Sequence, residues 1–334
     1  MKLTNKWIAL ILAIGMVCAL CIGCTKPNTD NPSSKPSGTP SGNTTQSQTT
    51  AEPETEPPLT KYGNYTTEGA AKTLEEIFAK EIKETDNTFA TGSSYSDEKL
   101  ANIHKIADYL ANYQKYVDEY DAQDKLDELY AETGFTLDLG FGAQMIKQYI
   151  DMTGETLDYS DRMLDLLEHP KVIAAQNTTV NAAMKAAENL VKSGQSGINI
   201  NQSTPMSFSS LRSSDGTIYF ALGSYHTMAD LTDVQRTGDT LTATLHFRIV
   251  DYYDWSINGT EPEFTTYLAK LDDSYRTLIG SMMDMETLEG FCQKDMAQLH
   301  LAGLAQNYLA HGTITYQITW TVGQTFDQAT VQQQ

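Results

Sequence analysis

Apolar side chains recur at three- and four-residue steps from about Thr66 to Gly194. The clearest such stripe consists of Leu100, Ile103, Ile106, Ala107, Leu110, Tyr113 and Val117. This spacing is typical of an amphipathic helix. Ser160 is expected to cap a helix over "DRMLDLLEH", and a further helix after Pro170 is expected to end at Gly194. We therefore expect a helical bundle over residues 61–200.

Over residues 201–334 the apolar period changes to two. Alternating runs cover 218–223, 241–250 and 313–322, which predicts half-buried antiparallel strands. The segment "RTGD" around Gly238 predicts a tight hairpin turn between the first two of these strands. A long helical insertion should separate the last two, and its apolar residues include Leu288, Phe291, Cys292, Met296 and Leu299, followed by "GLAQNYLAHG". The expected class is α+β, an N-terminal helical bundle followed by a twisted antiparallel sheet with a long helical insertion.

The first 23 residues have the layout of a secretory signal peptide. Lys2 and Lys6 precede an apolar run over 7–23, and small Gly23 precedes Cys24. The segment "LCIGC" resembles a bacterial lipobox, with Cys21 where that motif usually has leucine. The resemblance implies a lipid-modified Cys24 and a protein held on the extracytoplasmic face of a bacterial cell membrane. An uncleaved transmembrane helix is the alternative, because 17 residues are close to the minimum for a span.

Residues 24–60 are expected to form the lipidated cysteine and a disordered tether. The segment 25–60 holds seven of the ten prolines and no aromatic residue, so it cannot bury enough apolar surface to offset the entropy of ordering. Cleavage before Cys24 would leave Cys292 as the only unmodified cysteine. The mature chain then has no intrachain disulfide and depends on an ordinary hydrophobic core.

The charge narrows the partners. With 23 basic and 43 acidic residues the net charge is −20, which disfavours binding to nucleic acid. The partners that remain compatible with this charge are the membrane, bound through the lipid anchor, and a cell-envelope or protein partner. No nucleotide or metal cofactor is implied, because the chain lacks a P-loop, a Cys-x-x-Cys pair and a His-Glu-x-x-His motif. The acidic run 118–128 lacks the glycine of a calcium loop and is expected to be a solvated helix face or a helix junction.

The stretch "DYYDW" is the main candidate for chemistry. Strand alternation directs Asp251 and Tyr253 to the apolar face, and Asp254 to the other. A turn at Thr237-Gly238 would place Ser224 opposite Asp251 and His226 opposite Ile249, so that a histidine and a carboxylate share one face. Such a pair could act in general acid–base catalysis. In the alternative, Asp251 and Asp254 cap the following turn and His226 is structural.

Two resemblances concern this region. The segments "FALGSYH", "DYYDW", "LHLAGLAQNYLAHG" and "ITWTVG" resemble modules at the C-terminal ends of bacterial polymorphic toxins and related secreted proteins. Asp251, Tyr253 and Asp254 also match an Asp-x-Tyr-Asp motif of colicin-M-type enzymes, which cleave the lipid-linked peptidoglycan precursor. That family has His and Arg shortly downstream, whereas "WSINGTEPEFT" has neither.

Two functional hypotheses follow. The first is a membrane-anchored lipoprotein whose folded part is an interaction or cell-envelope module. The alternative is an envelope hydrolase or toxin-like enzyme with Asp251, Tyr253, Asp254 and His226 as its catalytic residues. A hydrolase requires a concave pocket in which Asp251 and a histidine converge, whereas an interaction module requires only an accessible surface.

Overall fold

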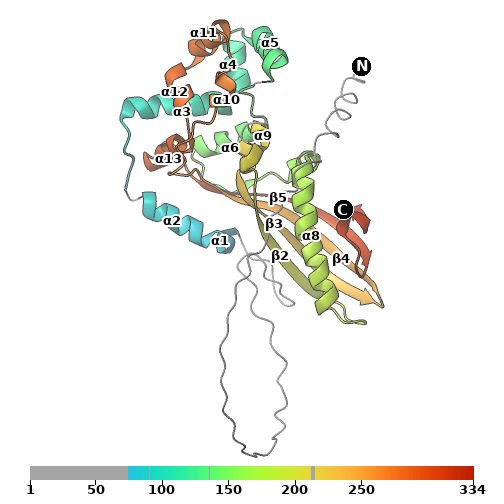
Figure 1. Cartoon of the computed structure of the whole chain (residues 1–334). Helices are drawn as coiled ribbons and strands as arrows, with labels where there is room; N and C mark the ends of the chain where they lie inside the picture. The colour runs from blue at the N-terminus through green and yellow to red at the C-terminus, as the bar shows by residue number, and fades with distance from the viewer. Residues whose placement is uncertain (1–73, 90, 135, 212–214) are drawn as a thin grey trace, which may run out of the picture. The chain divides into compact units, whose positions relative to one another are not determined.

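The computed structural model describes residues 74–334 apart from residues 90, 135 and 212–214. The signal peptide, Cys24 and the tether at 25–60 lie outside this part of the chain. All described residues belong to one compact unit. Helices and a six-stranded sheet are combined in it, which confirms the α+β class (Figure 1).

The elements follow one another in a helix-rich part, a sheet, a second helical part and a return to the sheet. The helices are α1 (Leu74–Ile77), α2 (Ala79–Phe89), α3 (Asp97–Ala111), α4 (Tyr113–Glu119), α5 (Gln123–Thr133), α6 (Phe141–Ile150), α7 (Met163–Leu166), α8 (Pro170–Leu190), α9 (Gly216–Leu222), α10 (Thr265–Leu268), α11 (Asp273–Met282), α12 (Met285–Gly290) and α13 (Gln293–Leu301). The strands are β1 (Leu157–Asp158), β2 (Ile198–Ser207), β3 (Ser224–Thr237), β4 (Thr240–Tyr253), β5 (Tyr308–Thr321) and β6 (Thr330–Gln333).

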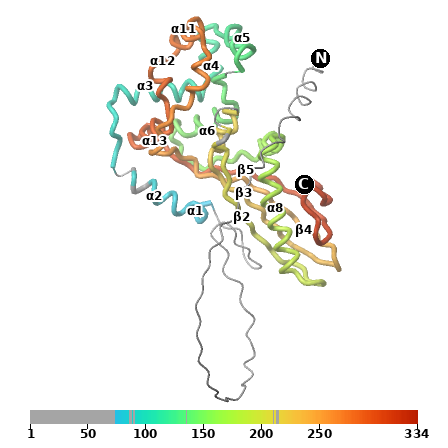
Figure 2. The backbone as a smooth tube through the Cα atoms, in the orientation of Figure 1, coloured from blue at the N-terminus to red at the C-terminus, as the bar shows by residue number. Residues whose placement is uncertain are grey.

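The apolar stripe of the first half is buried from Leu100 to Leu110, but the predicted single helix ends at Ala111 and a separate helix, α4, begins at Tyr113. Leu100, Ile103, Ile106 and Leu110 point from α3 into the core, and the Ser96 side chain caps the helix by accepting from the Lys99 N–H. Figure 2 shows α3 beside α12 and α13, which follow β4 in the sequence. The N-terminal helices and the predicted insertion therefore pack together.

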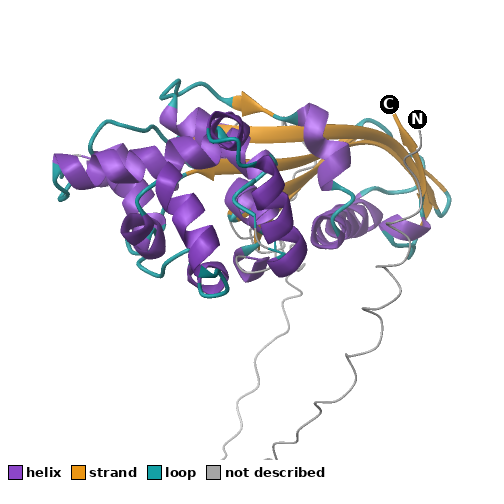
Figure 3. Ribbon diagram, turned by 90° about the horizontal axis from the view of Figure 1, so that it is seen from above, coloured by secondary structure: helices purple, strands orange, loops and turns teal. Residues whose placement is uncertain are grey.

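The sheet is a long antiparallel meander with short strands added at one edge. Its order is β1-β5-β4-β3-β2, with β6 also pairing with β5, and only β1 runs parallel to its neighbour. Helix α8 lies along one face of the meander, and most helices gather on one side of the strands (Figures 1 and 3). The α8 side chain of Thr179 meets Thr227 of β3 at 2.5 Å between their Oγ1 atoms. We call the face of the sheet that α8 covers the inner face, and the opposite face the outer face.

A single large apolar cluster joins the two regions that differ in sequence period. It includes Leu110 of α3, Met145 of α6, Phe247 of β4 and Met296 of α13, all fully buried. A second, small cluster lies on the outer face of the sheet, where Phe78 packs on Met228 and Val250. The segment α1–α2 is therefore held against the face that α8 does not cover.

The predicted register of the β3–β4 hairpin is wrong by one residue. The turn consists of Gly238 and Asp239, and the pair Thr237–Thr240 flanks it. The predicted turn was Thr237-Gly238, so this difference alone would shift the pairing by two residues and leave each side chain on its predicted face. A β-bulge then inserts one residue near Asp233, whose φ is +52°. His226 consequently pairs with Val250 rather than Ile249, and its side chain lies on the outer face.

The alternating run 218–223 is a helix rather than the predicted strand. Asp215 caps α9 by accepting from the Ile218 N–H, and the helix ends at Gly223, whose φ is +21°. All five residues over 218–222 are buried, so no exposed face distinguishes the two-residue period of a strand from the 3.6-residue period of a helix. The strand that pairs with β4 begins only at Ser224.

Three predicted boundaries also move. Helix α8 ends at Leu190, and Gly194 instead donates its N–H to the Arg236 carbonyl. Ser160 starts a short 3-10 helix (Ser160–Arg162), and Asp158 accepts from its N–H and hydroxyl. The last part of "GLAQNYLAHG" is strand, because β5 begins at Tyr308, which pairs with Tyr253.

Candidate functional site

Asp251 is a buried carboxyl group near the end of β4. Strand alternation continues from Ile249, so Asp251 lies on the inner face as predicted, with only 5% of its surface exposed. Its backbone pairs with Ala310 of β5. Burial raises the pKa of Asp251 well above its usual value, and the neighbouring Asp254 raises it further. The environment of Asp251 therefore disfavours the charged carboxylate relative to the neutral acid.

Tyrosines surround Asp251 on the inner face, but their hydroxyls bond elsewhere. Tyr253 donates to the Phe220 carbonyl at 3.0 Å, Tyr159 to the Ile249 carbonyl at 3.0 Å, and Tyr308 to the Met145 carbonyl at 2.8 Å. Burial, and secondarily the charge of Asp251, raises the pKa of Tyr253 well above its usual value. Tyr253, one of the predicted catalytic residues, thus ties β4 to α9 through a neutral hydroxyl.

Asp254 follows the strand and reaches solvent. Its side chain is exposed at the surface, although protein atoms crowd its other sides. Burial and then the nearby Glu81 carboxylate raise the pKa of Asp254 to about 6. A carboxyl group with this pKa changes its charge close to neutral pH.

His226 lies on the outer face, away from the inner-face position of Asp251. Its ring stacks on Phe78 of the α1–α2 segment, with 5.1 Å between centroids and 28° between planes. The residue is 9% exposed and has Val250 opposite it on β4. The predicted grouping of Ser224, His226, Asp251 and Tyr253 on one face is therefore not found.

Three cavities surround the end of β4, and Asp254 lines all of them. The first, of about 300 Å³, lies between Asp251, Trp255 and Gln293. The second, of about 370 Å³, lies between α2, the loop after β4 and α13. The third, of about 310 Å³, has both Asp251 and His226 in its walls, together with Phe78. We call the three cavities together the acidic cleft.

Several buried polar atoms in the walls of the acidic cleft have no hydrogen-bond partner within the described protein. They are the hydroxyl of Tyr225, the indole N–H of Trp255 and the side-chain oxygen of Asn307. Tyr225 is only 1% exposed. Leaving such groups unpaired costs free energy, and a bound molecule can supply the missing partners.

The pattern of the sequence predicted only part of this site. Asp251 and Asp254 are in the acidic cleft, and Trp255 follows them directly in "DYYDW". Glu81 and Asn307 were not anticipated, because they are distant in sequence and come from α2 and the segment before β5. Such convergence has no local sequence signal.

Among the described residues, no group of three or more His, Cys, Asp or Glu side chains is placed to hold a metal ion. Cys292 is 6% exposed, and its backbone N–H and thiol both donate to Asp295 at the start of α13. Burial raises the pKa of the Cys292 thiol, so it is a protonated, structural residue.

None of the helices in the described part of the chain is long and apolar enough to cross a membrane. Comparison with models of protein families, with curated proteins and with solved structures gave no match.

Proposed function

We propose that this chain is a lipid-anchored extracytoplasmic binding protein of the bacterial cell envelope, with the acidic cleft as its ligand site. The lipobox-like "LCIGC" and the proline-rich segment behind it support the anchored location. The unpartnered polar atoms of the cleft walls carry the proposal for binding, because a ligand would complete their hydrogen bonds.

The placement of His226 favours binding over catalysis. A general base must reach the proton that it removes, directly or through one water. His226 is stacked on Phe78 on the outer face, whereas Asp251 points to the inner face. The two groups thus approach the acidic cleft from opposite sides of the sheet.

Hydrolysis of an envelope substrate remains the second candidate, on one specific observation. Asp251 and His226 both line the 310 Å³ cavity, so a substrate there would contact both. In this reaction the protonated Asp251 would act as the general acid, and the ionised Asp254 would act as the general base.

A steric block tests the binding role without assuming any ligand chemistry. Thr85 of α2 lines the 370 Å³ cavity, so Thr85→Trp should fill part of it. The full-length protein in detergent micelles would be titrated with solubilised cell-envelope fragments of the producing bacterium. We expect at least tenfold weaker binding for Thr85→Trp. The matched control is Thr240→Trp, an exposed position beside the hairpin turn.

The same titration distinguishes the two functions. Binding that the block weakens, without release of smaller products, supports a binding protein. Product release that Asp251→Asn abolishes would instead support the hydrolase. Equal binding by the wild type and Thr85→Trp would contradict the acidic cleft as the ligand site.

A further inference from the structure

Trp255 is a partly exposed aromatic side chain in the wall of the acidic cleft. It lines both the 300 Å³ cavity and the 370 Å³ cavity. Its ring packs against two buried rings, those of Tyr253 and Phe220, with 6.0 Å between centroids in both cases. These contacts fix the orientation of the indole within the wall. Trp255 therefore presents a rigid apolar surface to the cavities on which a ligand can pack.

Many of the polar wall residues around Trp255 carry neutral hydroxyl or amide groups. In the 300 Å³ cavity they include Ser209, Ser224, Ser256 and Gln293, and in the 370 Å³ cavity Thr85, Thr88, Ser256, Asn258 and Asn307. The Gln293 side chain donates to the Tyr219 hydroxyl at 2.7 Å, which orients its amide. Hydroxyl and amide groups can bond to a neutral polar ligand without requiring a countercharge.

The carboxyl groups of the acidic cleft do not make it a site for a cation. Glu84 pairs with Lys80 of its own helix at 3.2 Å, and the surroundings of Asp251 disfavour its charged form. An anionic ligand would meet these carboxyl groups without a lysine or arginine among the described wall residues. The chemistry of the walls therefore favours a neutral polar ligand.

Three buried polar atoms of the walls require both kinds of hydrogen-bond partner. The Trp255 indole N–H can only donate and the Asn307 side-chain oxygen can only accept, and neither has a partner within the described protein. The Tyr225 hydroxyl, in a side chain only 1% exposed, can serve either role. A sugar ring carries several hydroxyl groups that both donate and accept, together with an apolar face of C–H groups. It therefore matches the unpaired atoms and the indole surface.

We propose that the acidic cleft binds a neutral saccharide, with one sugar ring lying against Trp255. The inference rests on the proposed binding role of the cleft and adds the chemical class of its ligand. The C–H face of the ring covers the indole, and hydroxyl groups of the saccharide bond with the Trp255 N–H, Asn307 and the neighbouring serines. Asp254 accepts from further hydroxyl groups of the saccharide.

A matched pair of trisaccharides tests the class of the ligand. Cellotriose is neutral, and the β-1,4-linked trimer of glucuronic acid has the same backbone with a carboxylate in place of each CH2OH group. The full-length protein would be titrated by calorimetry in micelles of a sugar-free detergent, at high ionic strength to screen repulsion from the net charge of −20. We expect cellotriose to bind at least tenfold more tightly than the acid. The neutral trimer of N-acetylglucosamine should also bind, because each acetamido group both donates and accepts.

A matched pair of tryptophan variants locates the sugar ring. Trp255→Phe removes the indole N–H and part of the ring surface, so we expect at least a fivefold loss of affinity for cellotriose. Trp320→Phe makes the same change at a tryptophan that is 1% exposed, has an unpartnered N–H as well, and lines none of the three cavities.

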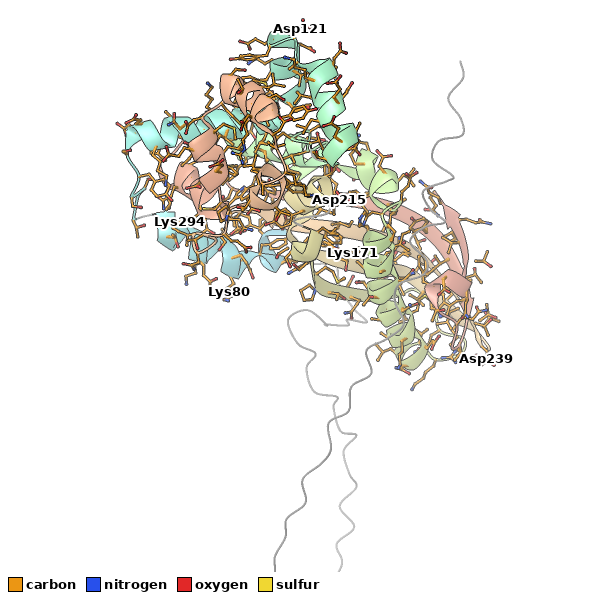
Figure 4. All side chains as sticks on the ribbon, turned by 45° about the horizontal axis from the view of Figure 1, so that its top comes forward. Lys80, Asp121, Lys171, Asp215, Asp239 and Lys294 are labelled. Carbon is orange, nitrogen blue, oxygen red and sulfur yellow. The ribbon has the colours of Figure 1, made fainter. Side chains whose placement is uncertain are left out.

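The control position is remote from the acidic cleft. Trp320 pairs with Leu241, close to the hairpin turn at Asp239. Figure 4 shows Asp239 at the end of the sheet far from Lys294 of α13, the helix that contributes to the cleft walls. Trp320→Phe should therefore bind cellotriose like the wild type. Thermal melts would check that both variants are folded at the temperature of the titration.

The outcomes separate the ligand class from the binding role. If neither neutral trimer binds the wild type, or if the acid binds as tightly as cellotriose, the saccharide assignment is wrong. Equal losses of affinity in Trp255→Phe and Trp320→Phe would also overturn it. If the trimers fail while Thr85→Trp still weakens binding of envelope fragments, the cleft is the ligand site and its ligand is of another class. Saccharide binding that neither Thr85→Trp nor Trp255→Phe changes would contradict both proposals.

Discussion

The rings of Phe78 and His226 stack at 5.1 Å, which joins the α1–α2 segment to the outer face of the sheet next to the acidic cleft. Phe78 is 4% exposed, and Ile77 beside it is also buried. Helix α2 contributes Glu81 and Glu84 to the cleft walls. This contact therefore positions one wall of the proposed ligand site.

Replacing Phe78 with alanine should release the α1–α2 segment. A buried Phe→Ala change costs about 3–5 kcal/mol, and Phe78 belongs to the small cluster that joins the segment to Met228 and Val250 of the sheet. Hydrogen exchange should therefore become faster in α1 and α2 while α3 and β4 stay protected. The control is Lys80→Ala, which removes a side chain that is largely exposed. Equal protection of α1–α2 in Phe78→Ala and the wild type would contradict the docking role.

The pair Asp230–Arg248 on the outer face should be a strongly coupled element of the sheet. The side chains are only 6% and 18% exposed, and burial raises the pKa of Asp230 against the opposing effect of Arg248. Arg248→Met would leave the carboxylate buried without its cation, at a cost of about 3–5 kcal/mol.

Chemical denaturation of a double-mutant cycle would measure this coupling. The variant Asp230→Asn with Arg248→Met should regain most of the stability lost by Arg248→Met alone. The control is Arg162→Met, since the pair Arg162–Asp165 is exposed and should contribute less than about 1 kcal/mol. Additive effects of the Asp230 and Arg248 substitutions would show that the pair is not coupled.

The buried Asp251 should make the protein less stable as the pH rises. Its pKa is raised in the folded state, so its stabilising contribution is complete below the pKa of the unfolded chain, about 4, and is lost as the pH rises toward the folded value. Asp251→Asn keeps the shape and cannot ionise. We expect the melting temperature of the variant to depend less on pH between 4.5 and 8, with the larger gain over the wild type at pH 8.

Thermal melts across this pH range provide the measurement. The matched control is Asp239→Asn, an exposed aspartate outside the core, which should leave the wild-type pH dependence intact. A variant Asp251→Asn that melts lower than the wild type at pH 8 would show that the carboxylate is stabilised by partners in its ionised form.

Lipid attachment at Cys24 remains a prediction from the sequence. Cys24→Ser should release the protein from the membrane fraction or block processing of the signal peptide. Cell fractionation with mass analysis of the N-terminus would detect either change. Normal processing with full membrane retention would contradict the lipobox assignment and favour an uncleaved span.

Residues 25–60 should contribute nothing to the stability of the folded part, because they contain no aromatic residue and only one large aliphatic residue, Leu59. Deleting them should change the melting temperature by less than about 2 °C. A larger shift would require the stability to change by more than several tenths of a kcal/mol. A larger decrease in a calorimetric scan would mean that the segment docks on the domain.

The spacing of apolar residues predicted the secondary structure well where one face of a helix or strand is buried and the other is exposed to solvent. The stripe of α3 and the alternation of β4 are both found as expected, because burial separates their faces. The run 218–222 is buried on all sides and was assigned to the wrong element. Side-chain period carries information only when the surroundings differ between faces.

The candidate site was harder to predict because it depends on pairing rather than on composition. Asp251 follows from the alternation of its own strand, and it is on the expected face. The position of His226 depends on the turn and on the bulge at Asp233, and neither has a strong local signal. A one-residue difference in register was enough to separate the histidine from the carboxylate.

The bulge at Asp233 also makes that separation difficult to reverse during evolution. Regular pairing of β3 with β4 through this point, with no residue removed, would move the register by one and bring His226 opposite Asp251. The same slip would turn Leu231 and Ala229, which are fully buried on the inner face, toward the outer face. A lineage that lost the bulge could therefore acquire the acid–base pair only if it rebuilt the hydrophobic core at the same time.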